Sequence, residues 1–292
     1  MFLATLACAA GNGPELMSPS HHYSLKLNAL VTPQTHTQGL FLRVRIDGGP
    51  ALRMLLDSGA EFIVLSERTG ARLRRQTGAE MDLVGVGAKS RTAKWVAPGT
   101  VEIGELALSG CEMAVAPGEL LDGVDGVIPL SLFAGFLVRL DVPGKTLELD
   151  PLPPRPPAAD DGYSAVRTER GMVFLEGSVD GAQPGYVMLD TGASFNAVSR
   201  ETANAHAGPR FGLRSLSLAG GSGETEGFML PAGVRFRFGS RVISADPVVV
   251  VDLSNLAGRH RFPIAGLLGY PGLRRSVVTV DYRDGLVRLA GR

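Results

Sequence analysis

Two related stretches of this 292-residue chain decide its fold. The first is Met54-Leu55-Leu56-Asp57-Ser58-Gly59-Ala60, and the second is Val187-Met188-Leu189-Asp190-Thr191-Gly192-Ala193. In each stretch, three apolar residues that suit a core strand lead directly into Asp, a hydroxyl residue and Gly, which suit a turn. The two aspartates, Asp57 and Asp190, are 133 positions apart (190 minus 57) and occupy equivalent points of two similar segments.

The same spacing relates other residues of the two halves. Asp47-Gly48 precedes Asp57 by ten residues, as Asp180-Gly181 precedes Asp190, and both dipeptides are typical of hairpin turns. Further equivalent pairs are Phe41 with Phe174, Leu42 with Leu175, Phe62 with Phe195, Ser66 with Ser199, Thr69 with Thr202 and Pro98 with Pro231. Later in each half, residues 125–129 correspond to residues 265–269 at a spacing of 140, so the second copy carries a few inserted residues. This constant register indicates an internal duplication.

The duplication predicts two lobes joined by a linker. Segment 151–157, which reads PLPPRPP, is too rich in proline for a helix or a central strand and indicates a stiff connector. We expect a leader or disordered N-terminus over residues 1–21, a first lobe over 22–150, a linker over 151–160 and a second lobe over 161–292. The 38 glycines and 19 prolines, with short Val- and Leu-rich runs between them, favour a mostly β fold.

Local patterns place some elements within each lobe. Ser66 and Ser199 stand where they would cap short helices over residues 66–75 and 199–207. Alternating apolar residues predict strands, which lie over 101–108, 136–140, 234–238 and 277–281.

Composition argues against several classes of partner. Lys plus Arg number 29 and Asp plus Glu number 29, so no net field favours nucleic acid, an anionic membrane surface or an acidic substrate. The five histidines are scattered without helical ligand spacing, and we predict no metal or other cofactor. Segment 85–90, GVGAKS, lacks the register of a phosphate-binding loop. No apolar stretch is long enough for a membrane span.

The N-terminus carries a weak export signal. Residues 1–11 are apolar and small but lack the basic region of a secretory signal peptide. Thr5-Leu6-Ala7-Cys8 weakly resembles the cleavage box of bacterial lipoproteins, in which the Cys becomes lipidated, and a disordered leader is the alternative. We therefore expect an extracytoplasmic protein that is periplasmic, lipid-anchored or secreted. Cys111 is the only other cysteine, so at most one disulfide can form.

The paired turns resemble the active-site turns of the aspartic protease clan, including its bacterial-type members. A lone Asp-Thr-Gly is most often an ordinary surface turn, so the argument rests on two copies in register. The Ala after each Gly resembles the turn sequence of the retropepsin-like members of the clan, and the presence of two lobes in one chain resembles the organisation of pepsin. The resemblance implies a mostly β, two-lobed acid-protease fold of the pepsin-like type, with pseudo-twofold symmetry and a cleft between the lobes.

The resemblance also implies a function. It implies an aspartic-type endopeptidase, a hydrolase in which the adjacent carboxyls of Asp57 and Asp190 share a proton and activate a water. It implies no cofactor, a peptide or protein substrate in the cleft, and a monomer, because one chain supplies both aspartates. The residues implied to support the dyad, by hydrogen bonding or by allowing close approach, are Ser58, Gly59, Thr191 and Gly192.

One departure from the clan concerns the support of the first turn. The clan uses an apolar-apolar-Gly segment behind each active-site turn, and Leu267-Leu268-Gly269 fits this pattern. In the first half, Pro129 stands after Val127-Ile128 where the glycine is expected. A catalytically inactive peptide-binding or structural relative of the same fold is therefore the alternative function.

A second departure concerns the flap, the hairpin that covers the cleft in the clan. The candidate hairpins are segments 85–95 and 220–229, and the candidate flap residues are Gly87, Trp95 and Gly221. The tyrosine that pepsins carry on their flap has no counterpart, since no tyrosine lies between Tyr23 and Tyr163. Trp95 is either its substitute or a half-buried strand residue.

Overall fold

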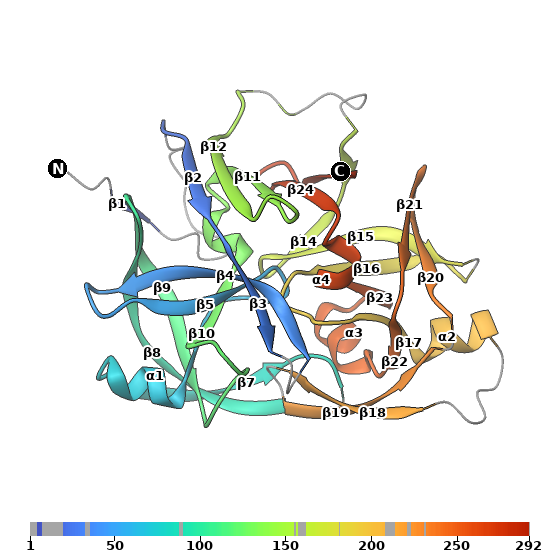
Figure 1. Ribbon diagram of the computed structural model, residues 1–292, viewed down its shortest axis with the longest axis horizontal. Coiled ribbons are helices and arrows are strands. Elements are labelled where there is room, and N and C mark those ends of the chain that lie inside the picture. The colour runs from blue at the N-terminus through green and yellow to red at the C-terminus, as the bar shows by residue number, and fades with distance from the viewer. Residues whose placement is uncertain are drawn as a thin grey trace.

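The structure is a computed structural model, which describes most of the chain. The described residues are 5–7, 20–32, 36–87, 90–154, 156, 162–180, 182–207, 214–220, 223–230 and 232–291. In these ranges strands predominate and the helices are short, as the composition predicts. The first half forms one lobe and the second half the other, and Figure 1 shows them on the left and right of the view.

The first lobe is built on one sheet. Its central strands run in the order β9-β6-β10-β5-β4, with β8 and β7 beyond β4, β1 beside β9 and β3 beside β4. The strands of this sheet are β1 (Thr5–Ala7), β3 (Asn28–Thr32), β4 (Thr37–Ile46), β5 (Leu52–Asp57), β6 (Ile63–Ser66), β7 (Thr77–Val84), β8 (Ser90–Ile103), β9 (Leu106–Ala116) and β10 (Gly126–Pro129).

The second lobe repeats this order. Its central strands run β22-β17-β23-β16-β15, which matches β9-β6-β10-β5-β4 strand for strand and confirms the duplication read from the sequence. The strands of this sheet are β14 (Arg167–Glu169), β15 (Met172–Val179), β16 (Gly185–Asp190), β17 (Asn196–Ser199), β18 (Ser215–Gly220), β19 (Gly223–Met229), β20 (Val234–Phe238), β21 (Arg241–Ala245), β22 (Val248–Val251) and β23 (Ile264–Gly269).

A third sheet joins the lobes, and it lies at the top of Figure 1. Its strands are β2 (Tyr23–Lys26), β11 (Phe136–Asp141), β12 (Thr146–Pro151), β13 (Ser164–Ala165), β24 (Ser276–Asp281) and β25 (Leu286–Gly291). At its centre β11 and β24 pair antiparallel, and Arg139 lies opposite Thr279. These two residues are 140 apart and are therefore each other's counterpart in the repeat, which places the pseudo-twofold axis between them.

Equivalent short helices follow equivalent strands, and a serine caps the start of each helix. Ser66 accepts a hydrogen bond from the Thr69 amide at the start of one helix, and Ser199 accepts one from the Thr202 amide at the start of its counterpart. The helices are α1 (Glu67–Arg72), α2 (Arg200–Ala207), α3 (Ser254–His260), α4 (Tyr270–Leu273) and the 3₁₀ helix η1 (Leu130–Phe133). None of the helices in the described ranges is long and apolar enough to span a membrane.

The structure differs from the sequence prediction at two places. Residues 101–108, predicted as one strand, are the end of β8, a turn at Gly104, and the start of β9. Gly104 has a φ of +61°, which glycine adopts without steric cost, and the apolar alternation continues on both sides of it. Residues Thr5–Ala7, predicted to lie in the leader, form β1 and pair parallel with β9. Cys8 lies outside the described residues, and Cys111 is buried in β9.

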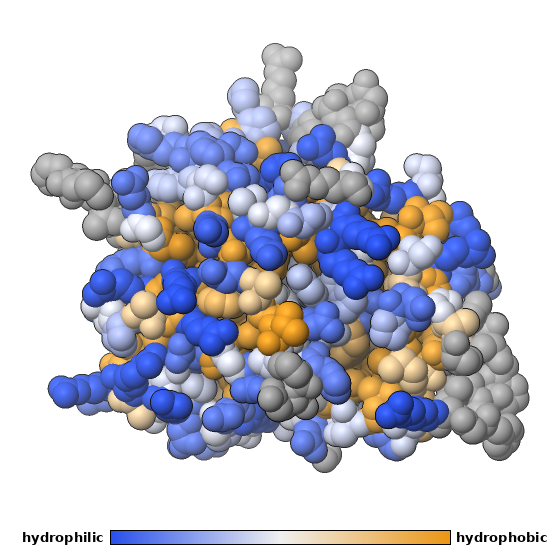
Figure 2. All heavy atoms as spheres, viewed as in Figure 1, coloured by the Kyte–Doolittle hydropathy of each residue, from blue (hydrophilic) through white to orange (hydrophobic). Residues whose placement is uncertain are grey.

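The main hydrophobic core runs through both lobes and the joining sheet. It includes Leu56 of the first lobe, Leu189 of the second, and Val138 and Val280 of the joining sheet. On the face seen in Figure 2, hydrophilic residues predominate and hydrophobic ones form separate patches. The core therefore fixes the two lobes against each other as well as folding each one.

Candidate active site

Asp57 and Asp190 end the central strands of their lobes. Strand β5 delivers Asp57 and lies between β4 and β10, and β16 delivers Asp190 and lies between β15 and β23. The apolar side chains that precede both aspartates are almost fully buried, which fixes the strand register and hence the point where each turn begins.

The two turns meet back to back across the lobe boundary. A Cβ atom added to Gly59 would lie 2.8 Å from Cγ of Asp190, and one added to Gly192 would lie 2.4 Å from Cγ of Asp57. Neither glycine has a positive φ, so the turns need glycine for space and not for an unusual backbone conformation. The two carboxyls lie within hydrogen-bonding reach of each other.

Ser58 and Thr191 tie the turns together through a symmetric set of hydrogen bonds. Thr191 Oγ1 accepts from the Ser58 amide at 3.0 Å and donates to the Leu56 carbonyl at 2.8 Å. Ser58 Oγ accepts from the Thr191 amide at 3.0 Å and donates to the Leu189 carbonyl at 2.8 Å. Both hydroxyls are buried, so each one satisfies two backbone groups of the opposite lobe that water does not reach.

Backbone amides orient the two carboxylates. Gly59 N donates to Asp57 Oδ1 at 2.7 Å, and Gly192 N and Ala193 N donate to Asp190 Oδ1 at 3.0 and 2.9 Å. Burial raises the pKa of both aspartates, and the charge of Asp57 raises the pKa of Asp190 further. The pair therefore retains one proton at a pH where free carboxyls have lost theirs.

A cavity of about 530 Å³ opens onto the dyad. Both aspartates, Gly59 and Gly192 line it, and most of the remaining wall is apolar. Among the apolar side chains of the wall are Phe62, Leu120 and Leu121 from the first lobe and Met172, Leu216 and Leu218 from the second. A volume of this size between two apolar walls suits several side chains of an extended ligand.

A hairpin from each lobe borders the cavity. The β7–β8 hairpin contributes residues 82–86 to the wall, and the β18–β19 hairpin contributes Leu216, Ser217, Leu218, Gly220 and Met229. Gly87 lies at the tip of the first hairpin, whereas Gly221 lies outside the described residues. Trp95 is half-buried in β8, packs on Phe62 with ring centroids 4.6 Å apart, and does not line the cavity. Its place is that of a strand residue behind the wall.

A family model described as aspartyl protease matches the chain over residues 42–130 and 175–271, once in each lobe. The chain belongs to the aspartyl protease family. The crystal structure of aspartic proteinase from Irpex lacteus has a similar fold, with a TM-score of 0.56 and 13% identity over 93% of this chain and 97% of that one. No curated protein sequence matches the chain. The pepsin-like, two-lobed fold predicted from the sequence is thus confirmed.

This aspartyl protease supports its two active-site turns in different ways. In the second lobe, Gly269 N donates to Asn196 Oδ1 at 3.1 Å, and a Cβ on Gly269 would lie 2.0 Å from the Phe195 carbonyl. In the first lobe Pro129 has no amide hydrogen to donate, and Ile63 stands where Asn196 stands in the repeat. Donor and acceptor of this hydrogen bond are therefore lost together in the first lobe.

The proline also fits the backbone that it occupies. Pro129 has a φ of −70°, close to the value that the proline ring imposes, and Gly269 has a φ of −84° at the equivalent point. Pro129 lies opposite Asp57 in the parallel pairing of β10 with β5, as Gly269 lies opposite Asp190 in the pairing of β23 with β16. The first turn of this aspartyl protease thus has its supporting strand in register despite the missing glycine.

Cross-lobe contacts beyond the turns were not predicted from the sequence. Ser194 Oγ accepts from Gln38 N at 2.8 Å and donates to Gln38 O at 3.1 Å. Glu61, the counterpart of Ser194 at a spacing of 133, instead accepts two hydrogen bonds from Arg259 of α3. The sequence does show that Glu61 in the first copy replaces Ser194 of the second, and an unmatched carboxylate of this kind signals a charged partner. It does not show which arginine of the opposite lobe is that partner.

In the described part of this aspartyl protease, no group of three or more His, Cys, Asp or Glu side chains is placed to hold a metal ion.

Proposed function

We propose that this chain is an aspartic endopeptidase and that Asp57 and Asp190 are its catalytic residues. The observation that carries the proposal is the meeting of the two turns at the cavity, where each glycine faces the opposite carboxyl at a distance that leaves no room for a Cβ atom. Two carboxyls held this close resist ionising together and share a proton, which is the state that general acid–base hydrolysis requires.

The shared proton gives the two carboxyls of the pair complementary roles. The ionised carboxylate takes a proton from a water that attacks the peptide carbonyl carbon. The protonated carboxyl donates a hydrogen bond to the carbonyl oxygen and stabilises the developing charge. The tetrahedral intermediate then breaks its C–N bond as the nitrogen takes up the proton that the dyad took from the water, and the products are a carboxylic acid and an amine.

The shape of the cavity supports an extended peptide as substrate. The dyad lies between a wall from the first lobe and a wall from the second, so a chain crossing it would place successive side chains against alternate walls. Because both walls are mainly apolar, bulky apolar side chains on both sides of the cleaved bond are favoured.

Cleavage of an unfolded protein mixture between about pH 3 and 7 tests the proposal. We expect cleavage by the wild-type chain and loss of cleavage in both Asp57→Asn and Asp190→Asn. Asp141→Asn is the matched control, because Asp141 is buried but lies in the joining sheet and does not line the cavity. Activity retained in both dyad variants would refute the assignment. Peptide binding without turnover, unchanged by either dyad substitution, would instead favour the inactive peptide-binding relative.

A further inference from the structure

Helix α3 belongs to the second lobe but contacts two separate parts of the first. Asn255 Nδ2 donates to the carbonyl of Gly87, at the tip of the β7–β8 hairpin, at 3.0 Å. Arg259 donates through Nε and Nη2 to the two carboxylate oxygens of Glu61 at 2.9 and 2.8 Å. Asn255 and Arg259 are four residues apart, so they lie on the same face of the helix, and that face is directed at the first lobe.

The contact at the hairpin tip has several parts. Gly87 N donates to the carbonyl of Asp252, just before α3, at 3.0 Å. Gly87 therefore donates one hydrogen bond to the second lobe through its amide and accepts one from it through its carbonyl. Gly87 has a φ of +100°, and a Cβ atom there would lie 2.3 Å from Thr225 Oγ1 of the other hairpin. Val84 and Val86 pack against the apolar cluster of the second lobe that contains Leu256 of α3. The hairpin thus crosses the cavity and docks on the opposite lobe.

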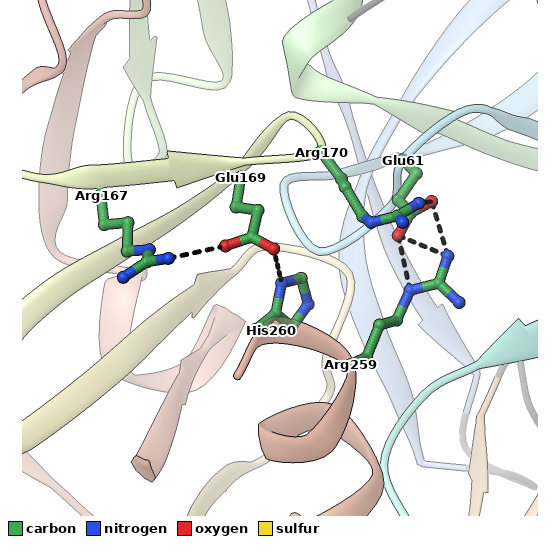
Figure 3. Close-up of polar contacts among 6 residues, drawn as sticks. All are labelled: Glu61, Arg167, Glu169, Arg170, Arg259 and His260. Carbon is green, nitrogen blue, oxygen red and sulfur yellow. Dashed lines mark hydrogen bonds and ion pairs between the residues drawn. The ribbon is translucent and has the colours of Figure 1, made fainter. Parts of the chain in front are cut away.

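The contact at Glu61 lies beside the dyad, and Figure 3 shows the three side chains that form it. Glu61 follows the active-site turn, two residues after Gly59, and both Glu61 and Arg259 line the cavity. Arg170 approaches the same carboxylate at 3.5 Å. This ion pair is bidentate, with two parallel hydrogen bonds from the guanidinium to the carboxylate. The Glu61 side chain is 16% exposed and that of Arg259 is 24% exposed, so the pair is shielded from water more than a surface ion pair is.

We propose that α3 is an inter-lobe clasp, in which Asn255 positions the hairpin tip over the cavity and Arg259 positions the loop that follows Asp57. The proposal rests on the proposed function, and it adds two positioning residues on a helix that carries neither aspartate. Since the two residues share one rigid helical turn, the clasp fixes the covering hairpin and the active-site loop of the first lobe relative to each other.

The two contacts predict different kinetic effects. The hairpin must leave α3 for a peptide to enter and must return to cover it, so loss of the Asn255 contact weakens the closed complex and raises KM. The Glu61 loop carries no substrate-covering element, so loss of the Arg259 contact displaces the turn at Asp57 and lowers kcat.

Amide hydrogen exchange and peptide-cleavage kinetics on the full chain test the clasp. For Asn255→Ala we expect exchange over residues 80–87 to quicken roughly threefold to tenfold, the range for one hydrogen bond, with a similar rise in KM and little change in kcat. For Glu61→Gln and Arg259→Ala we expect quicker exchange over residues 58–63 and a lower kcat, with partial recovery in Arg259→Lys, which keeps the charge but not the fork.

Gly258→Ala is the matched control. It lies in the same helix, is exposed, and a Cβ atom there meets nothing within 4 Å, so it should leave exchange in both segments and both kinetic constants unchanged. Exchange over residues 80–87 in Asn255→Ala that equals the control would overturn the clasp, as would an unchanged kcat in Glu61→Gln. If the wild-type chain cleaves no peptide, the proposed function fails, and the exchange data alone decide whether α3 holds the first lobe.

Discussion

Replacing Thr191 with Val tests the hydrogen-bond network that joins the two active-site turns. Valine has the shape of threonine but no hydroxyl, so the substitution removes two hydrogen bonds and leaves the packing volume almost unchanged. It deprives the Ser58 amide of its acceptor and the Leu56 carbonyl of its donor. Both groups lie at the lobe boundary and belong to buried residues: Ser58 is 2% exposed and Leu56 is 0% exposed. Water therefore does not replace the lost partner.

The expected cost follows from the two groups left without partners. A buried polar group without its hydrogen bond costs about 1 to 3 kcal/mol, so Thr191→Val should lower the free energy of unfolding by about 2 to 6 kcal/mol. The upper part of the range applies if the turns stay closed, and the lower part applies if they separate enough to admit water. If the turns separate, the dyad geometry also changes, and kcat/KM should fall.

Urea unfolding followed by circular dichroism measures the change in the free energy of unfolding. The control is Thr92→Val, an exposed threonine in β8, which should stay within about 0.5 kcal/mol of the wild type. We expect a lower midpoint with an unchanged dependence on urea concentration for Thr191→Val, because the surface exposed on unfolding does not change. Ser58→Ala removes the mirror-image bonds and should cost a similar amount.

A loss below about 1 kcal/mol in Thr191→Val would refute this reasoning, because it would mean that the buried partners are satisfied without the hydroxyl. A large loss in one variant and none in its mirror image would refute the symmetry of the network. The double variant should lose less than the sum of the single losses, since the residues act in one network.

Three further predictions concern the same site. In Gly192→Ala the new Cβ would lie 2.4 Å from Cγ of Asp57, so kcat/KM should fall roughly a hundredfold, and a wild-type rate would contradict the close approach. In Asn196→Ala the Gly269 amide loses its acceptor, so the free energy of unfolding should fall by at least about 1 to 3 kcal/mol in urea titrations, and no loss would show that this support is dispensable. Burial raises the pKa of Asp190 well above 3.8, the ordinary value for an aspartate. The native state therefore favours the protonated carboxyl. The stability that this gives is complete below pH 3.8 and is lost as the pH rises through the native pKa. Asp190→Asn cannot ionise, so its melting temperature relative to wild type should rise with pH above 3.8, and a constant difference would contradict the raised pKa.

The sequence alone predicted the features that depend on local or repeated patterns. Asp57 and Asp190 were found because a buried strand followed by Asp, a hydroxyl and Gly occurs twice in one register, and the caps at Ser66 and Ser199 were found because capping needs only a few adjacent residues. The β class followed from composition. The turn at Gly104 was missed because apolar alternation continues through it and hides the break between two strands.

The tertiary structure decided how the two halves meet. The pairing of β11 with β24, the hydrogen bond from Gly269 to Asn196 and the docking of α3 on the first lobe join residues far apart in the chain. Each half has its own periodicity, and that periodicity shows which face is buried but not which residue of the other half lies against it. The sequence therefore determined the duplication, the β class and the two aspartates. Only the packing of one lobe on the other determined the dyad's environment, because that contact has no repeat and no local signal in the chain.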